Sequence, residues 1–425
     1  MKQKMNLDKL LERKKDEYID HLKNLVKIDT RVIGHGIKGG NEINGQKYLK
    51  VLIENIGGRP EYSNIKAEKI KEAKCKFNEG NLGHNYYNRP NLLGFFDGYS
   101  SGKSLIVNGH IDTMPFGDKK NWHRDPFLGE QINGKIYGLG SSDMKAGLLA
   151  SLFGIDLIYS AGYNLKGDII YQSVVDEEGG GNGTLSLVQE GYKADAAIVC
   201  EPTSLNLQIA HMGFIFYEII LLGKPIHSSQ KWKGINAIHK AYKLINGLME
   251  LEHQWLLKYK HPLMPPPTIN IGYIKGGDEA STVPASCSFK ICVHYFPGIK
   301  REKIDSDIRQ TLQKLNDLDP WLSENPVEIS IYQEGSSFEI DKNHHLVKTF
   351  KKYIPNDKEI NASPSGNDAR IFSNIADIPV VVFGPGSLEK AHSIDEDVSI
   401  DDYISSILSY AKFYCDWCGI ENEDN

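Results

Sequence analysis

The chain has 425 residues, with 49 Lys or Arg against 55 Asp or Glu, so its formal net charge is −6 with the histidines neutral. Hydrophobic residues make up 40% and charged residues 24%, a globular composition that excludes a disordered or collagen-like chain. The length predicts two or three domains rather than a single core. The acidic balance argues against nucleic acid as a partner, because nonspecific binding needs clustered positive charge.

No apolar run reaches the roughly 18–20 residues of a membrane-spanning helix, and residues 1–21 lack the apolar stretch of a signal peptide. We therefore expect a cytoplasmic protein with no membrane partner that acts on small molecules. The six cysteines are irregularly spaced and predict no disulfide framework. Cys415 and Cys418 form one C-x-x-C, which could bind metal or do redox chemistry. Because no second such pair exists, we interpret it as packing.

An amphipathic helix is predicted over 7–28, where apolar residues recur at spacings of three and four. Residues 57–91 are rich in Lys, Glu, Asn and Gly with weak periodicity, so we expect irregular surface structure without readable chemistry. Helical spacing returns at 145–160 and 183–190 and alternates with short apolar runs, which predicts an α/β sheet. The runs predict buried strands at 91–96, 104–107, 168–174, 196–199 and 379–383.

The middle of the chain has a different order of elements. A strand, a long helix, two strands and a charged helix are predicted at 214–222, 234–257, 268–274, 287–296 and 300–317. This order predicts an α+β module inserted into the first domain. The predicted domains are 1–211 together with 331–425, and the inserted segment 212–330.

A His-x-Asp motif follows one of the predicted strands. His110 ends the apolar strand in LIVNGHIDT and Asp112 lies two residues later, so in extended backbone both side chains point to one face. This suits a metal-binding imidazole that a neighbouring carboxylate orients. The same spacing recurs at His123 and Asp125, and an isolated pair of this kind has an ordinary structural explanation. The two pairs differ in context, because His110 ends an apolar strand whereas His123 lies in a loop.

Further carboxylates and a second imidazole follow other predicted strands. Asp143 comes after a Gly/Ser loop where a helix begins, and could be an N-cap. Glu177 and Glu178 in VVDEEGG could be a solvated strand end, while Glu201 in CEPT and His392 in AHSIDEDV complete the set. One α/β sheet would bring these strand ends together. Imidazole and carboxylate donors suit two divalent ions such as zinc, with a shared carboxylate as in two-metal hydrolases.

The ordered motifs GHIDTMPFG, YGLGSSDMKAG, VVDEEGG, CEPT and AHSIDEDVSI resemble those of the dinuclear zinc acylamino-acid hydrolases. This family includes acetylornithine deacetylase, succinyl-diaminopimelate desuccinylase, aminoacylase-like enzymes and exopeptidases, and the resemblance runs from about residue 20 to the end of the chain. It implies a zinc-exopeptidase-like α/β catalytic domain with a mixed, mostly parallel sheet and an inserted α+β lid or dimerisation domain. It also implies a homodimer and a non-proline cis peptide between Asp143 and Met144.

Carried over residue by residue, the resemblance implies a centre of two divalent ions, zinc or else cobalt or manganese. Asp143 would bridge the two ions. His110 and Glu201 would hold one ion, and Glu178 and His392 would hold the other.

The resemblance also implies three catalytic roles. Glu177 would be the general base, taking a proton from a metal-bridged water that attacks an amide carbonyl and passing it to the departing amine. Asp112 would orient His110. His227 of the inserted module resembles the family's lid histidine, which stabilises the oxyanion and in dimeric relatives comes from the partner subunit; a plain surface histidine is the alternative.

The residues expected to bind a substrate carboxylate depart from the family pattern. Relatives often carry Asp-x-Arg where this chain has Cys292-Val293-His294, and Asn where it has Thr282. A guanidinium is the natural clamp for a carboxylate, so its absence weakens the case for a substrate with an α-carboxylate. Arg370 in SPSGNDARIF could replace the clamp or form a structural ion pair.

We therefore predict a metal-dependent amidohydrolase that removes the acyl group of a small N-acyl amine or amino acid, an acetylornithine deacetylase-like deacylase. Alternatives within the family are a dipeptidase or other exopeptidase, and a deformylase of an N-formyl heterocyclic amine, which the missing Arg favours. A noncatalytic binding protein on the same scaffold would lack a ligand or the base, whereas all six positions are filled here.

Overall fold

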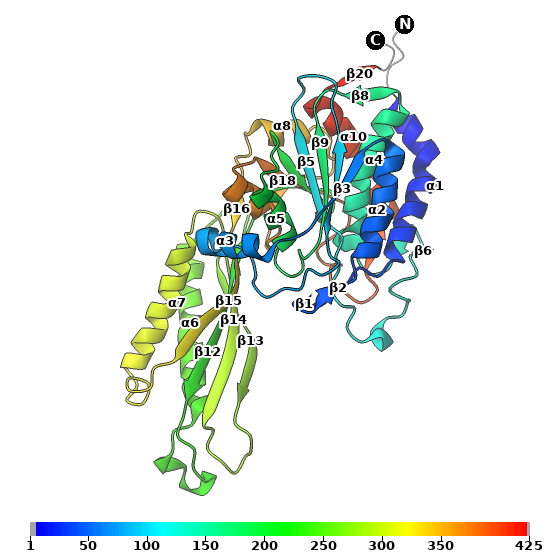
Figure 1. The fold of residues 1–425 in the computed structure, drawn as a ribbon. Helices are drawn as coiled ribbons and strands as arrows, with labels where there is room; N and C mark the ends of the chain where they lie inside the picture. Colours follow the sequence, from blue (N-terminus) through cyan, green and yellow to red (C-terminus); the bar gives the residue numbers. More distant parts are fainter. Residues whose placement is uncertain (1–5, 423–425) are drawn as a thin grey trace. The chain divides into compact units, whose positions relative to one another are not determined.

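The computed structural model describes residues 6–422 and divides into two compact units (Figure 1). Residues 1–5, part of the segment in which we expect no signal peptide, and 423–425 lie outside the described residues. None of the described helices is long and apolar enough to cross a membrane. Unit 1 consists of Met1–Ile209, Glu339–Asn361 and Asn367–Asn425, and unit 2 of Ala210–Phe338 and Ala362–Gly366.

A nine-stranded mixed sheet is the frame of unit 1. Its order is β16-β11-β18-β10-β5-β9-β4-β3, with β17 paired to β11. The central strands β18, β10, β5 and β9 run parallel to one another. Strand β4 pairs antiparallel with β9, and β3 pairs antiparallel with β4. This confirms the predicted mixed sheet with a parallel centre. The bounds are β3 (Arg59–Ser63), β4 (Asn91–Phe96), β5 (Leu105–His110), β9 (Ile169–Val174), β10 (Ala197–Val199), β11 (Leu207–His211), β16 (Phe338–Glu339), β17 (Ile360–Ser363) and β18 (Val380–Val382).

The central strands are buried on both faces, as their continuous apolar sequences require. Every residue of β5, β10 and β18 is buried. Helix α4 is apolar on nearly all sides and packs against both α1 and α10. The helices of unit 1 are α1 (Leu7–Val26), α2 (Ile43–Ile56), α3 (Ala67–Phe77), α4 (Ala146–Ser160), α5 (Asn182–Glu190), α8 (His345–Phe350), α9 (Ala369–Ile371) and α10 (Ile400–Trp417).

Short antiparallel pairs complete unit 1. They form a three-stranded sheet of order β19-β7-β6 and two separate pairs, β1 with β2 and β20 with β8. Their bounds are β1 (Val32–Gly36), β2 (Gly39–Gly40), β6 (Glu130–Ile132), β7 (Lys135–Tyr137), β8 (Tyr163–Leu165), β19 (Asp397–Ser399) and β20 (Ile420–Asn422). All six cysteines are free, so the C-x-x-C forms no disulfide.

The prediction of irregular structure over 57–91 was wrong for 59–63 and 67–77, whereas 78–90 lie in neither a helix nor a strand. The segment contains β3 and α3, and α3 buries only Ile70 and Ala73, which explains its weak periodicity. Two charged residues of this segment, Glu79 and Arg89, are buried.

Unit 2 is a four-stranded antiparallel sheet of order β13-β14-β12-β15, with two helices packed along it (Figure 1). Burial alternates along β12 and β14, which gives the sheet one face against the helices and one more exposed face. The predicted segment 212–330 ends within β15, which pairs with β12, and unit 2 runs on to Phe338. The bounds are β12 (Gly213–Leu222), α6 (Ala237–Lys258), β13 (Thr268–Gly276), β14 (Ser286–Tyr295), α7 (Arg301–Asp317) and β15 (Glu328–Gly335).

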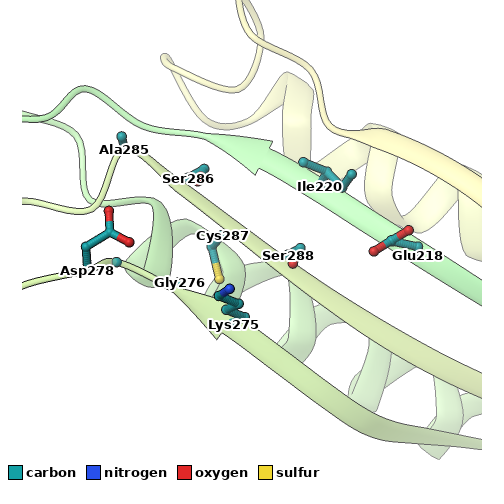
Figure 2. Close-up of a pocket in the computed structure, with 10 residues that line it drawn as sticks. Glu218, Ile220, Lys275, Gly276, Asp278, Ala285, Ser286, Cys287 and Ser288 are labelled. Carbon is teal, nitrogen blue, oxygen red and sulfur yellow. The ribbon is translucent and has the colours of Figure 1, made fainter.

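A pocket of about 240 Å³ lies on strands β12, β13 and β14 of unit 2 (Figure 2). Polar and charged side chains line it, among them Glu218, Lys275, Asp278 and Ser288. None of its lining residues belongs to the predicted metal site, which lies in unit 1.

Candidate active site

Most of the predicted ligands follow parallel strands of the unit 1 sheet. His110 is the last residue of β5, Glu177 and Glu178 come shortly after β9, and Glu201 comes shortly after β10. These strands are neighbours, so their carboxyl ends bring the side chains to one place. His392 arrives from the longer segment that follows β18.

Asp143 reaches the site by a different route from the one expected. It does not end a strand but lies in the segment Ser141–Lys145 directly before α4, at a kink where its own backbone angles are not helical. The prediction that all the candidate ligands lie at strand ends was therefore wrong for this residue. The peptide bond between Asp143 and Met144 is cis, as the family resemblance implied. The N-cap of α4 is Lys145, and the Asp143 carboxylate points to His110 instead.

The side chains form two adjacent groups. His110 Nε2 lies 3.1 Å from Asp143 Oδ1 and 3.9 Å from Glu201 Oε1. His392 Nε2 lies 2.9 Å from Glu178 Oε1 and 3.5 Å from Asp143 Oδ2. The groups are His110, Glu177 and Glu201, and Asp143, Glu178 and His392, each with one donor atom per residue within 4.8 Å of the others.

The electrostatics of this cluster fit a pair of cations. Burial raises the pKa of Glu201 to about 8, and burial together with the Glu201 charge raises the pKa of Glu177 well above its usual value. The hydrogen bond with Glu178 raises the pKa of His392 to about 9. These carboxylates are packed close enough to disfavour their own charged forms, which divalent ions would relieve. The donors, imidazole nitrogen and carboxylate oxygen, are those that zinc accepts.

Residues 106–416 match the model of peptidase family M20/M25/M40. The chain belongs to this family.

Two groups of curated relatives have different substrates. The N-formyl-4-amino-5-aminomethyl-2-methylpyrimidine deformylase of Halalkalibacterium halodurans is 34% identical over 361 residues, covering 78% of this chain and 84% of the relative. The acetylornithine deacetylase of Erwinia tasmaniensis is 31% identical over 303 residues, covering 70% of this chain and 76% of the relative. The protein described here, as a member of the M20 family, is therefore an enzyme and a metal-dependent amidohydrolase.

Solved structures agree in fold. A tripeptidase from Staphylococcus aureus superposes with a TM-score of 0.72 at 21% identity, covering 95% of this chain and 99% of that one. A metallo-carboxypeptidase from Sulfolobus solfataricus gives a TM-score of 0.72 at 19% identity, with 94% and 98% covered. These likenesses establish the α/β fold with its additional antiparallel sheet.

Asp112 is held differently from the expected arrangement in this M20-family site. Its carboxylate lies 3.8 Å from His110 Nδ1, whereas its backbone carbonyl oxygen lies 2.8 Å from the same nitrogen. The carboxylate accepts hydrogen bonds from the backbone N–H groups of Glu177 at 3.4 Å and Glu178 at 3.1 Å. Asp112 thus contacts His110 through its backbone and the Glu177–Glu178 turn through its side chain.

Glu396 is a buried residue that the sequence analysis did not single out. Its carboxylate accepts hydrogen bonds from the backbone N–H groups of Gly140 and Ser142, each at 2.8 Å, and of Asp143 at 2.9 Å. Burial raises its pKa to about 8. Glu396 therefore fixes the turn that presents Asp143, and its signal was its place in the motif AHSIDEDV.

A second missed feature is a buried ionic network behind Glu177. Arg89 donates to Glu42 Oε1 at 2.6 Å and to Asp176 Oδ1 at 3.0 Å, and all three side chains are fully buried. His84 Nδ1 lies 2.7 Å from Asp176 Oδ2. Asp176 has a positive φ of 68°, a left-handed conformation that is unusual without glycine, and it directly precedes Glu177. The network thus anchors the turn that carries Glu177.

Arg370 forms a structural ion pair. It is 2% exposed, and its guanidinium donates to Glu79 Oε2 at 3.1 Å, to the Asn367 carbonyl oxygen at 2.7 Å and to the Gly180 carbonyl oxygen at 2.9 Å. All three guanidinium nitrogens are thus engaged within unit 1. The alternative in which Arg370 replaces the missing carboxylate clamp loses its support.

His227 and His294 both lie in unit 2. His227 precedes the short helix Ser228–Lys233, and its Nδ1 accepts a hydrogen bond from the Ser229 backbone N–H at 3.2 Å. His294 lies half-buried on β14, and burial lowers its pKa, so the position where relatives often carry Arg favours a neutral side chain.

Proposed function

We propose that the chain hydrolyses the amide bond of a small N-acylated amine at a centre of two divalent ions that share Asp143. The supporting observation is that the two Asp143 oxygens face different imidazoles, Oδ1 at 3.1 Å from His110 Nε2 and Oδ2 at 3.5 Å from His392 Nε2. His110 and Glu201 would hold one ion, and Glu178 and His392 the other. Zinc suits these donors, with cobalt or manganese as alternatives.

Glu177 is the general base of this proposal. Two bound divalent ions would polarise the amide carbonyl and make water more acidic. The Glu177 carboxylate accepts a proton from the attacking water and gives it to the amide nitrogen as the C–N bond breaks, while the hydroxyl joins the acyl carbon. The hydrogen bond from its backbone N–H to Asp112 supports the position of Glu177.

His227 is the proposed donor to the oxyanion. Its Nδ1 lies 2.8 Å from Ser229 Oγ and 3.2 Å from the Ser229 backbone nitrogen. With Nδ1 accepting from that N–H, Nε2 carries the ring proton and is the hydrogen-bond donor. A donor directed at the developing oxyanion is worth about 10²–10³ in kcat. We propose that the protein is a homodimer in which His227 of one subunit acts at the active site of the other. A fully active monomer in light scattering would contradict that placement.

The proposed substrate is an N-formyl heterocyclic amine rather than an N-acetylated amino acid. The deformylases of a formylated aminopyrimidine are 34% identical to the chain, against 31% for the acetylornithine deacetylases. An α-carboxylate calls for a guanidinium clamp, and Arg370 is engaged by Glu79 while His294 occupies the family's Arg position. These observations together favour an amine without a carboxylate. The cytoplasmic location stays a prediction.

A substrate panel tests the proposed function. Zinc-loaded protein is assayed on the formylated aminopyrimidine, N-acetylornithine, an N-succinyl amine and dipeptides, with Glu177→Gln as the inactive control. We expect hydrolysis of the formyl substrate with the highest kcat/KM. No hydrolysis of any panel member, or full activity of Glu177→Gln, contradicts the mechanism, and preference for dipeptides or acetylornithine contradicts the substrate.

A further inference from the structure

A cavity of about 230 Å³ lies in unit 1 beside His392, which is one of its lining residues. The same imidazole approaches Glu178 Oε1 to 2.9 Å, so the cavity adjoins the proposed metal centre. Its volume suits one small ring better than an extended peptide. Its apolar walls include Phe116, Trp122, Leu139 and Ile394.

Hydrogen bonds tie the two loops of this cavity to each other. Trp122 is only 9% exposed, and its indole N–H donates to the Phe116 carbonyl oxygen at 2.8 Å. On the other loop, the Asp395 carboxylate accepts the His123 backbone N–H at 3.0 Å and the next backbone N–H at 3.2 Å. The walls are therefore held in place before any ligand arrives, which lowers the entropic cost of binding.

The cavity offers no lysine or guanidinium clamp for a carboxylate, and its one basic lining side chain, His392, is a proposed metal ligand. Its ten lining residues include neither Lys nor Arg. Among the cations close to it in sequence or space, Lys119 and Arg31 are already engaged. Lys119 Nζ lies 3.0 Å from Asp125, and Arg31, whose guanidinium stacks on the Phe116 ring at 4.5 Å, pairs with Asp29 at 2.7 Å.

The polar groups of the cavity favour a hydrogen-bond donor. Asp118 and Asn121 both line it, and the Lys120 backbone N–H donates to Asp118 Oδ1 at 3.0 Å, which orients the carboxylate. Carboxylate and amide oxygens accept hydrogen bonds from ring amino groups. Phe116 and Trp122 offer faces and edges on which a planar ring packs.

We propose that this cavity binds the amine part of the substrate as a planar heteroaromatic ring bearing an amino group, and that Phe116 is a specificity-determining residue. The inference rests on the proposed function, because a formyl group has almost no bulk and selection must then occur on the amine side of the amide. The ring packs against Phe116 and Trp122, its amino group donates to Asp118 or Asn121, and the scissile amide lies toward His392.

The test compares a ring-bearing and a ring-free substrate on zinc-loaded enzyme. We expect Phe116→Ala to raise KM for the formylated aminopyrimidine about tenfold, which lies within the range that base–aromatic stacking is worth, and to lower kcat/KM for N-formylmethylamine far less. Ile394→Ala, at a half-exposed wall position, is a second variant with the same expected direction. Tyr99→Ala, at an exposed aromatic outside the cavity, is the control and should change neither substrate.

Calorimetry separates failure of the cavity from failure of the proposed function. Binding of the free aminopyrimidine amine to zinc-loaded Glu177→Gln should weaken about tenfold on adding Phe116→Ala. Equal loss on both substrates, or ring binding that ignores Phe116→Ala and Ile394→Ala alike, overturns the cavity assignment while the hydrolase stands. Ring binding that depends on Phe116 without hydrolysis of any substrate overturns the proposed function and leaves the cavity assignment standing.

Discussion

In unit 1 charged side chains are buried in clusters, whereas in unit 2 many of them pair on the surface. Arg89, Glu42 and Asp176 are fully buried in one network directly behind the predicted base. On α7 of unit 2, by contrast, Lys303 and Arg309 pair with carboxylates one turn away and remain about half exposed. Buried charges are costly unless they are fully partnered, so their concentration in unit 1 marks where the chemistry takes place.

The largest expected effect is the loss of turnover on substitution of Glu177, which tests the role of the buried carboxylates in unit 1. Glu177→Gln should lower kcat by about 10²–10⁴-fold, because it removes the group that moves the proton. Since Glu177 is proposed as the base and not a ligand, metal analysis should find the same content as in the wild type. Loss of an ion from this variant would show instead that Glu177 ligates together with His110 and Glu201. Glu54→Gln, at an exposed position, is the control.

The buried network of unit 1 gives the next largest effect. Arg89→Met should lower the free energy of unfolding by about 3–5 kcal/mol, because it leaves Glu42 and Asp176 as uncompensated buried charges. Urea denaturation measures this, with Lys69→Met as the control. Lys69 pairs with Glu72 at an exposed site, where the expected loss is about 0–1 kcal/mol. Equal stability of the two variants would remove the contrast between buried and surface charge.

A smaller effect is expected in unit 2, where Asp319 is an exception to the surface pattern. Burial alone would raise its pKa, but hydrogen bonds from Lys240 and from the Leu322 and Trp321 backbone N–H groups lower the pKa from 3.8 to about 2. A depressed pKa stabilises the fold above about pH 4, and this contribution is lost as the pH falls toward 2.

Asp319→Asn should therefore cost about 1–2 kcal/mol at pH 6 and little at pH 2. The difference between the urea midpoints of variant and wild type at the two pH values measures it. Asp317→Asn, on the exposed end of α7, is the matched control and should differ from wild type by less than about 0.5 kcal/mol at both. A pH-independent difference for Asp319→Asn would exclude the charge as its cause.

Elements with strong apolar patterns could be predicted from the sequence. The strand at 91–96 matches β4 residue for residue, and the helix over 145–160 differs from α4 by one residue, because both are long buried runs. Helix α3 was missed because it is rich in Lys and Glu and buries only two residues. Its packing partner α5 lies about a hundred residues away in the chain, where no local pattern can reveal it.

The same limit applies to the site. The ligand candidates could be found because each follows a recognisable apolar strand or a Gly-rich turn. The Asp112 side chain could not be placed, because alternation of side chains holds only within a strand and β5 ends at His110. The contact between Arg89 and Asp176 joins residues 87 positions apart, and only the folded chain brings them together.

Metal content is the most direct test of the proposed two-ion centre. Chains purified with excess zinc and then desalted should contain two ions each, and Asp143→Ala should lose most of both, because its carboxylate is shared. His392→Ala should keep one. One ion in the wild type, or two ions retained by Asp143→Ala, would contradict a shared carboxylate and with it the proposed centre.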